Sequence, residues 1–317
     1  MNYSIRHTQH KGLDLVVLTD HGCGTELSIL PAFGAILHGF SIRMGDKRLD
    51  IIDHYDSLGE LQSTLNRSYK SSKLSPFVCR IADGKYQFAG RQYEFAEKFP
   101  DGSAIHGLLF NKSFTLTAEE SGPDSARAVL DYFYKKDDPQ YPYEYNCQVT
   151  YTLLSNNVLD LQTRVTNHSE VAIPMADGWH PYFTLGGKVD DWLMQVNADS
   201  ILEFNDKLIP TGRRISYDQF AFSNCIEKTE LDNCFVVNPA KDRLACELYN
   251  LHNKVKLSFY PDDSYPYLQI YTPPHRNSIA IENLSAAPDC FNNQIGLLVI
   301  APGASQTFGL RYKVSIA

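Results

Sequence analysis

Residues 145–166, YNCQVTYTLLSNNVLDLQTRVT, contain two runs rich in valine, threonine, leucine and tyrosine, separated by the turn residues Ser-Asn-Asn. Short runs of this kind, bounded by turn residues, are typical of antiparallel sheets. The pattern recurs from one end of the chain to the other. The clearest predicted strands are Leu13 to Leu18, Ala35 to Arg43, Ala126 to Tyr134, Tyr145 to Leu153, Val158 to Thr166, Lys254 to Tyr260 and Thr307 to Val314. The sequence therefore predicts an all-β fold.

Two local patterns add detail to this prediction. Aromatic residues alternate through Tyr86 to Phe95 on both sides of an Ala-Gly pair, which predicts a hairpin with one buried face. A single helix is predicted near Asp56 to Asn66, because Leu58, Leu61 and Leu65 share one face and Ser57 with Glu60 fits a capping box. No linker, charge block or repeat divides the chain. We therefore expect residues 1–317 to form one large antiparallel β-sandwich with little helix.

The composition limits the partners of the chain. It has 29 Lys and Arg against 37 Asp and Glu, a net charge of −8, whereas a nucleic-acid binder needs a concentrated basic face. The longest apolar run, Ile295 to Ala304, is interrupted by glycine and proline and is shorter than the ~20 residues that span a bilayer. The N-terminus does not resemble a secretory signal, and the seven scattered cysteines indicate reduced thiols. We expect a cytoplasmic protein without nucleic-acid or membrane partners; its oligomeric state is not indicated.

Several segments place ionisable residues among aromatic and turn-forming residues. They are Ser75 to Gly84, Ile105 to Gly107, Gly178 to Phe183, Glu230 to Phe235 and Ile279 to Asn283. Each one alone has an ordinary structural explanation, such as a surface ion pair for Arg80 or a packed ring for His180. Embedded ionisable groups indicate functional sites only statistically.

Together, and in this order, the segments resemble the aldose 1-epimerase (galactose mutarotase) family. The matching segments are Arg80-Ile-Ala-Asp-Gly84 for the binding arginine, His106-Gly107 for the first active-site histidine, His180-Pro-Tyr-Phe183 for the catalytic histidine, Leu231-Asp-Asn-Cys-Phe235 for the binding aspartate and Ile281-Glu282 for the catalytic glutamate. Weaker matches occur at Pro31 to Ala35 and at Pro302-Gly303. The resemblance implies a galactose mutarotase-like supersandwich that acts on a small sugar without a cofactor.

The chain departs from the family pattern at three positions. Cys79 stands where an asparagine commonly precedes the arginine, Thr184 where an asparagine commonly follows the Tyr-Phe pair, and Asn233 where a histidine often follows the aspartate. The amide lost at Cys79 is a good partner for a sugar hydroxyl. The preferred sugar is therefore left open.

The resemblance also implies roles for the matching residues. Exchange of α and β anomers requires one group to take the proton from the anomeric hydroxyl while another gives a proton to the ring oxygen. Glu282 is the expected base and His180 the expected acid, on opposite sides of the pyranose. Arg80, His106 and Asp232 are expected to bind hydroxyls, with all five residues converging in one open cleft. Possible sugar-stacking residues, each equally explained by core packing, are Trp179, Tyr182 and Phe291.

A metal site is not predicted. His106, His180, Asp232 and Glu282 are all possible ligands, but no two of them have the short spacing of a zinc motif.

Three other functions remain open. A hexose-6-phosphate 1-epimerase needs a cationic pocket, and Arg213-Arg214 is the only tight arginine pair. A non-catalytic carbohydrate-binding module on the same fold needs neither Glu282 nor His180. A glycosidase would pair Glu282 with Asp289 or Asp232 across a glycosidic bond.

Overall fold

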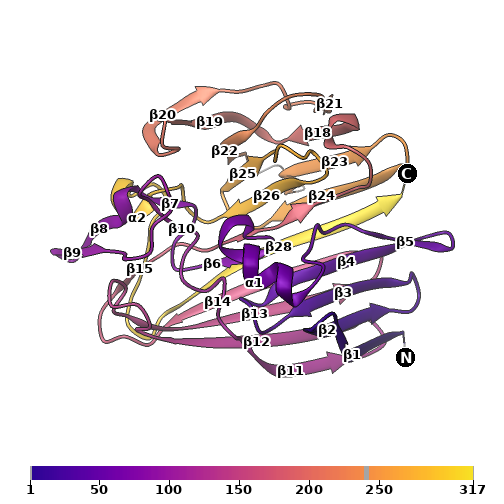
Figure 1. Cartoon of the computed structure of the whole chain (residues 1–317), viewed down its shortest axis with the longest axis horizontal. Coiled ribbons are helices and arrows are strands. Elements are labelled where there is room, and N and C mark those ends of the chain that lie inside the picture. Colours follow the sequence, from indigo (N-terminus) through magenta and orange to yellow (C-terminus); the bar gives the residue numbers. More distant parts are fainter. Residues whose placement is uncertain (1, 239–242, 317) are drawn as a thin grey trace.

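The computed structural model describes residues 2–238 and 243–316, and its regular structure is mostly strand (Figure 1). The described residues contain two α-helices, α1 (Leu58–Ser68) and α2 (Cys290–Asn293), and two 3-10 turns, Ala82–Gly84 and Val189–Asp191. Every named strand pairs antiparallel with its neighbours. The predicted all-β class with few short helices is therefore confirmed.

One layer of the sandwich is a nine-stranded sheet. Its strands, in spatial order, are β11 (Thr115–Ser121), β12 (Ser125–Lys135), β13 (Glu144–Leu154), β14 (Val158–Asn167), β28 (Ser305–Ile316), β24 (Val255–Pro261), β23 (Cys246–Asn250), β18 (Trp192–Val196) and β21 (Asn224–Cys225). The two strands predicted within residues 145–166 are β13 and β14, which are neighbours in the interior of this layer.

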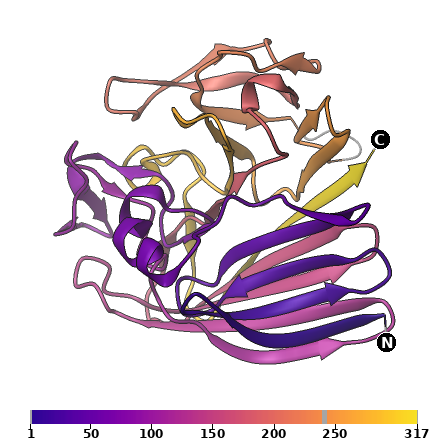
Figure 2. The same ribbon diagram turned by 45° about the vertical axis from the view of Figure 1, so that its right-hand side comes forward.

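The facing layer consists of two sheets. The first has the order β20 (Pro210–Ser216), β19 (Ala198–Phe204), β22 (Asp232–Val237), β25 (Tyr267–Tyr271), β26 (Ile279–Leu284), β16 (Gly178–His180) and β6 (Ser72–Leu74), with β17 (Tyr182–Phe183) also paired to β26. We call it the eight-stranded sheet. The second is the five-stranded sheet of β1 (Tyr3–His10), β2 (Leu13–Asp20), β3 (Thr25–Leu30), β4 (Ile36–Met44) and β5 (Lys47–Asp50). Figure 2 shows it lying over the magenta strands β11 to β13.

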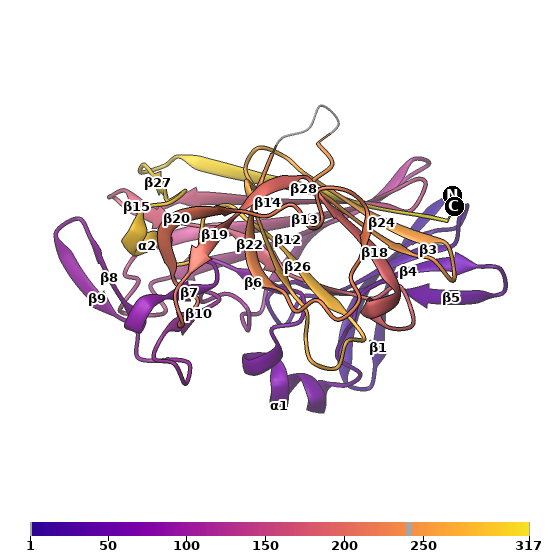
Figure 3. The same ribbon diagram turned by 90° about the horizontal axis from the view of Figure 1, so that it is seen from above.

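The remaining strands form three short two-stranded sheets. They are β7 (Arg80–Ile81) with β10 (Ala104–Ile105), β8 (Lys85–Phe88) with β9 (Arg91–Glu94), and β15 (Ile173–Met175) with β27 (Leu298–Ile300). The β8–β9 pair is the predicted hairpin, and its turn residues Ala89 and Gly90 have φ of 49° and 76°, as a two-residue turn of this kind requires. Seen from above, this hairpin projects at one end of the molecule (Figure 3).

Helix α1 follows the predicted capping chemistry. The Ser57 hydroxyl accepts a hydrogen bond from the Glu60 N–H, and the Glu60 carboxylate accepts one from the Asp56 N–H. Leu61 and Leu65 are buried in a small apolar cluster beneath the helix. None of the helices in the described parts of the chain is long and apolar enough to cross a membrane.

A buried ion pair lies between the two layers, on the core side of β16. The Lys73 ammonium on β6 donates to the Asp177 carboxylate at 2.6 Å and to the Gly178 carbonyl at 3.1 Å, and it lies 4.4 Å from the centroid of the Trp179 ring. The Tyr265 hydroxyl donates to the same oxygen of Asp177 at 2.7 Å. Both charged side chains are fully buried. The pair therefore fixes β16, only three residues long, against β6.

We expect Lys73→Met to lower the free energy of unfolding by about 3–5 kcal/mol, because it leaves the Asp177 charge buried without a partner. The double variant Lys73→Met/Asp177→Leu should recover most of this loss, because apolar pairs replace buried ion pairs at little cost. Urea unfolding of the three proteins measures both effects.

The matched control is Lys98→Met, which breaks the exposed pair of Lys98 with Glu94. Exposed pairs contribute about 0–1 kcal/mol, so this variant should unfold nearly as the wild type does. A Lys73→Met variant as stable as Lys98→Met would contradict the assigned role of the buried pair.

Candidate functional site

The register of the eight-stranded sheet puts three of the predicted residues on one face. Glu282 pairs with Gln269 across β25 and β26, and Asp232 pairs with Tyr271 across β22 and β25. Gly178 of β16 pairs with Leu284, so His180, two residues from Gly178, lies on the same face as Glu282. Side chains from three strands that are far apart in sequence thus meet above one sheet.

The other two residues come from the β7–β10 ladder. Arg80 pairs with Ile105, and the His106 N–H donates to the Cys79 carbonyl at 2.8 Å. Cys79 and His106 both have left-handed φ, 48° and 61°, a conformation that is rare for residues other than glycine. Non-glycine residues held in this region are concentrated at functional sites.

The glycine of the His-Gly pair is required by a close approach of two backbone segments. At Gly107, φ is 77°, and an added Cβ would lie 2.4 Å from the Ser75 carbonyl oxygen. Only glycine fits there, so Gly107 allows the His106 loop to lie against the segment that leads to Arg80.

Asp289 has a structural role in the same region. Its N–H donates to the Arg80 carbonyl at 2.7 Å, and its carboxylate accepts from the Ala82 N–H at 2.9 Å and from the Asn292 amide at 2.7 Å. Asp289 thus holds the backbone of residues 80–82 in place through these hydrogen bonds.

His106, His180 and Glu282 form the centre of the site. His180 Nε2 lies 3.2 Å from Glu282 Oε1, and the His106 and His180 rings meet edge to face at 4.8 Å. The three residues are 7%, 6% and 2% exposed, so the centre is deeply buried. The predicted residues therefore do converge, and the open cleft stays a prediction.

The contact between His180 and Glu282 also corrects their expected placement. Groups 3.2 Å apart cannot stand on opposite sides of a pyranose ring. They can instead approach one edge of a sugar, where the anomeric oxygen and the ring oxygen are both bonded to C1.

Arg80 and Asp232 lie at the rim of this centre. The Arg80 guanidinium donates to Asp101 at 3.0 Å, and Asp232 accepts from the Gln269 amide at 2.6 Å. Both side chains are partly exposed. A ligand that reaches Glu282 therefore meets one positive and one negative group on the way.

Burial sets the protonation of the central groups. It raises the pKa of Glu282 well above its ordinary value, with Asp232 adding to the rise and Arg80 opposing it. It lowers the pKa of His180 to about 4, and it lowers the pKa of His106 well below the ordinary value, helped by His180 and Arg80. In this buried site, the proton of the His180–Glu282 pair is therefore favoured on the carboxyl group.

The centre holds polar atoms without a protein partner. In the described part of the chain these buried atoms are Ser72 Oγ, His106 Nδ1, His180 Nδ1, Gln269 Oε1 and Glu282 Oε2. Ser72 pairs with His180 across β6 and β16, and Gln269 pairs with Glu282, so both face the centre. Buried polar groups are normally hydrogen-bonded. A ligand rich in hydroxyl groups would satisfy several of them at once.

Of the three possible stacking residues, only Tyr182 lies at the site. Its ring stacks on His180 with centroids 5.1 Å apart. Trp179 points to the opposite face of β16 and packs between Lys73 and Tyr151, because successive side chains of a strand alternate. Phe291 is buried against aromatic rings of the core. The stacking expectation for Trp179 and Phe291 is therefore wrong.

Sequence reasoning missed three residues that contact the predicted ones. Gln269 binds Asp232, Asp101 binds Arg80, and the Tyr69 ring lies 4.5 Å from the His106 ring. Gln269 carried a usable signal, since it is the one polar residue in the apolar strand 267–271. Asp101 and Tyr69 lie in ordinary turn sequence, and only the fold brings them to the site.

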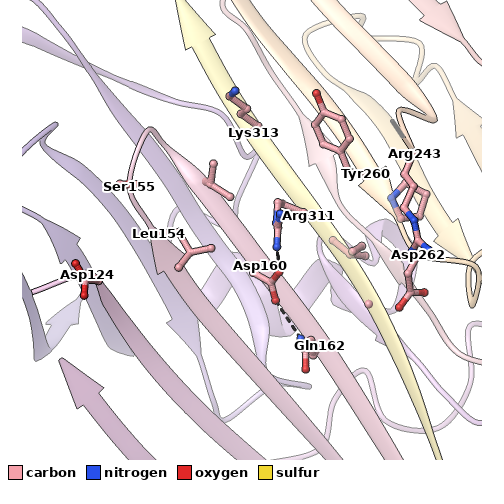
Figure 4. A pocket seen from close by; sticks show the side chains of 14 residues that line it. Asp124, Leu154, Ser155, Asp160, Gln162, Arg243, Tyr260, Asp262, Arg311 and Lys313 are labelled. Atoms are coloured by element: carbon pink, nitrogen blue, oxygen red, sulfur yellow. Dashed lines mark hydrogen bonds and ion pairs between the residues drawn. The ribbon is translucent and has the colours of Figure 1, made fainter. Parts of the chain in front are cut away.

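A surface hollow lies elsewhere, on the nine-stranded sheet (Figure 4). Its volume is about 720 Å³, and its charged groups include Asp160 and Arg311, which pair with each other at 2.9 Å. It contains none of the predicted site residues. A second hollow, of about 600 Å³, is lined by Ile105 and Gly107, on either side of His106, and by Tyr69.

Comparison with known proteins gives related sequences and a shared fold. YihR of Escherichia coli strain K12 is 27% identical over 237 residues, covering 73% of this chain and 74% of YihR. The maltose epimerase of Levilactobacillus brevis is 25% identical over 260 residues, covering 75% of this chain and 74% of that protein. The crystal structure of a galactose mutarotase-like protein from Clostridium acetobutylicum has a TM-score of 0.89 at 16% identity, covering 100% of this chain and 99% of that one.

This structural likeness shows the fold, and the sequence comparison shows the family. The sequence model of the aldose 1-epimerase family matches residues 14–313, nearly the whole chain. The segments with Arg80, His106, His180, Asp232 and Glu282 all lie within the match, and the protein therefore belongs to the aldose 1-epimerase family.

Proposed function

We propose that the protein interconverts the α and β anomers of a free aldohexose, with Glu282 and His180 as its acid–base pair. The observation that carries this proposal is the buried contact of 3.2 Å between His180 Nε2 and Glu282 Oε1. Two proton-exchanging groups at this separation can address the anomeric hydroxyl and the ring oxygen of one sugar from the same edge.

In the ring-opening step, the Glu282 carboxylate takes the proton of the anomeric hydroxyl. The C1–O bond to the ring oxygen breaks, and the ring oxygen receives a proton from the His180 imidazolium. The product is the open aldehyde, with Glu282 protonated and His180 neutral. Rotation about C1–C2 and the reverse transfers close the ring on the other face of the carbonyl.

The number of protons that this mechanism requires agrees with the burial of the pair. The pair carries one proton, which burial favours on Glu282 before the sugar binds. Sugar hydroxyls that donate to Glu282, together with Arg80, favour its charged form, and the proton moves across the contact to His180. No metal or redox group is needed for these steps.

The remaining site residues hold the sugar. Arg80 and His106 offer N–H donors and Asp232 offers acceptor oxygens, and charged partners make the stronger hydrogen bonds. Gln269 connects the Asp232 contact to the strand of Glu282. Tyr182 offers a ring surface beside His180.

The alternative phosphorylated substrate would need a cationic pocket, and one arginine of the only tight pair is already engaged by another residue. Arg213 lies on the edge strand β20, where it is held by Glu203 at 2.6 Å. The glycosidase alternative with Asp289 is disfavoured because that carboxylate is occupied by the Ala82 N–H and Asn292. Only a measurement of activity distinguishes a non-catalytic sugar-binding module from an enzyme.

Polarimetry of freshly dissolved α-anomers tests the proposal and finds the sugar. The panel should include galactose, glucose, xylose, arabinose and maltose, the last because one relative is named a maltose epimerase. We expect the protein to accelerate the change in rotation for at least one sugar. Binding without acceleration would indicate the non-catalytic module.

We expect Glu282→Gln to lower kcat by ~10²–10⁴ with a much smaller change in KM, because glutamine keeps the shape but cannot accept the proton. His180→Asn should behave similarly, whereas Asp232→Asn should also raise KM. The matched control is Glu247→Gln on β23 of the other sheet, which should leave both constants unchanged. Near-wild-type turnover by Glu282→Gln would rule out Glu282 as the base.

The pH dependence of kcat/KM provides a second test. The pair works with one proton, and a second proton binds to His180 only as the pH falls through its pKa of about 4. We therefore expect kcat/KM to stay level from neutral pH to about pH 5 and to decrease below that. An acid limb already centred near pH ~6.5, the ordinary value for histidine, would contradict a buried His180.

A further inference from the structure

The centre of the site has the ligand set of a zinc site, which sequence spacing does not reveal. His106, His180 and Glu282 each place one ligand atom within 4.8 Å of the other two. Two imidazoles and one carboxylate, with a position left open, are a common ligand set of zinc in proteins. The three residues are separated by 74 and 102 positions, as their numbers show, so no local motif could indicate the site.

A second observation supports a ligand at this place. His106 Nδ1 and Glu282 Oε2 have no hydrogen-bond partner among the described residues, and both side chains are more than nine-tenths buried. Buried polar groups are normally hydrogen-bonded, and each exception needs an explanation such as a bound ion. A nitrogen and an oxygen of this kind in one cluster point to a ligand that binds both.

An ion would require the ligand atoms to move closer together. Because zinc–ligand bonds are about 2 Å long and tetrahedral, ligand atoms lie about 3.3 Å apart, so atoms that are 4.8 Å apart must approach by roughly 1.5 Å through side-chain rotation. The closest pair, His180 Nε2 and Glu282 Oε1, is already 3.2 Å apart. The neighbouring charges, Arg80 on β7 and Asp232 on β22, have opposite signs and offset each other around the ion.

We propose that His106, His180 and Glu282 bind Zn²⁺ and that the bound ion inhibits the protein. Imidazole ligands favour zinc over magnesium or calcium, which prefer an all-oxygen shell. The ion occupies the lone pairs that would exchange protons with a sugar, so binding of zinc and turnover exclude each other. The inhibition rests on the proposed mutarotase function, whereas the binding of zinc does not.

Equilibrium dialysis of the metal-free protein against ZnCl₂, with MgCl₂ in a parallel series, measures the binding directly. We expect wild-type protein to bind one equivalent of Zn²⁺ that Glu282→Gln and His106→Asn bind at least about 10-fold more weakly. The matched control is His252→Asn, which changes a histidine in the turn before β24 and should retain this equivalent. Zinc held by the free thiols, such as the partly exposed Cys23 and Cys225, would be unaffected by all three substitutions.

Circular dichroism and thermal unfolding confirm that the variants are folded. If one of the two ligand variants does not fold, the zinc affinity of the other still tests the site. Competition in the wild-type protein is a third measurement: the sugar found by polarimetry should displace the bound equivalent of zinc. Zinc binding that is unchanged in the folded ligand variants, or Mg²⁺ binding as tight as Zn²⁺ binding, would overturn the proposal.

The activity assay separates this inference from the proposed function. Micromolar Zn²⁺ should slow mutarotation and EDTA should restore it, while EDTA alone should not reduce the rate. Site-specific zinc binding without any mutarotation would support the metal site and refute the proposed function. Mutarotation that Zn²⁺ does not slow would refute the inhibition and leave the proposed function intact.

Discussion

The site depends on the register of three neighbouring strands, β16, β26 and β25. Side chains alternate between the two faces of a sheet, so a slip of one residue would turn Glu282 into the core and Ile281 toward the candidate site. The buried pair of Lys73 with Asp177 helps to fix this register, because it joins β6 to the first residues of β16 on the face opposite to His180. The same sandwich core that stabilises the fold thus positions His180 and Glu282.

The same burial that packs the sheets also tunes the chemistry. Glu282 and His180 lie in a deeply buried centre where both charged forms are disfavoured, and their pKa values move in opposite directions. A pair that holds one proton between two such groups can act in either direction, which a reversible anomer exchange requires. In the proposed function, Arg80 and Asp232 at the rim are the charged contacts that orient a neutral sugar.

Much of the fold was predictable from the sequence, because strand composition and turn residues are local properties. The central strands, the β8–β9 hairpin and the capped helix α1 were all predicted at nearly their observed positions. The pairing order of the sheets was not predictable, since it joins segments such as β14 and β28 that are far apart in the chain. That residues 1–317 form one domain stays a prediction.

For the site, the family resemblance indicated the candidate residues. Which of their side chains lie on the same face could be known only from the register of the strands. Trp179 and Tyr182 were equally plausible as stacking residues, and strand alternation decides between them. The burial of Lys73 depends on a partner outside its own strand, so no local pattern indicated it. Gln269 is marked as the one polar residue of its strand, but its contact with Asp232 appears only in the fold. The closeness of His106, His180 and Glu282 likewise appears only in the folded chain.

The central claim is that this site opens and recloses the ring of a free aldose, and magnetisation exchange at equilibrium tests it most directly. Two-dimensional NMR exchange spectroscopy of an equilibrated sugar reports transfer between the α and β anomeric protons without any net reaction. We predict exchange peaks that appear with the protein for the preferred aldose and are absent for its methyl glycoside, which has no anomeric hydroxyl proton to give to Glu282. The absence of protein-dependent exchange for every free aldose in the panel would contradict the account.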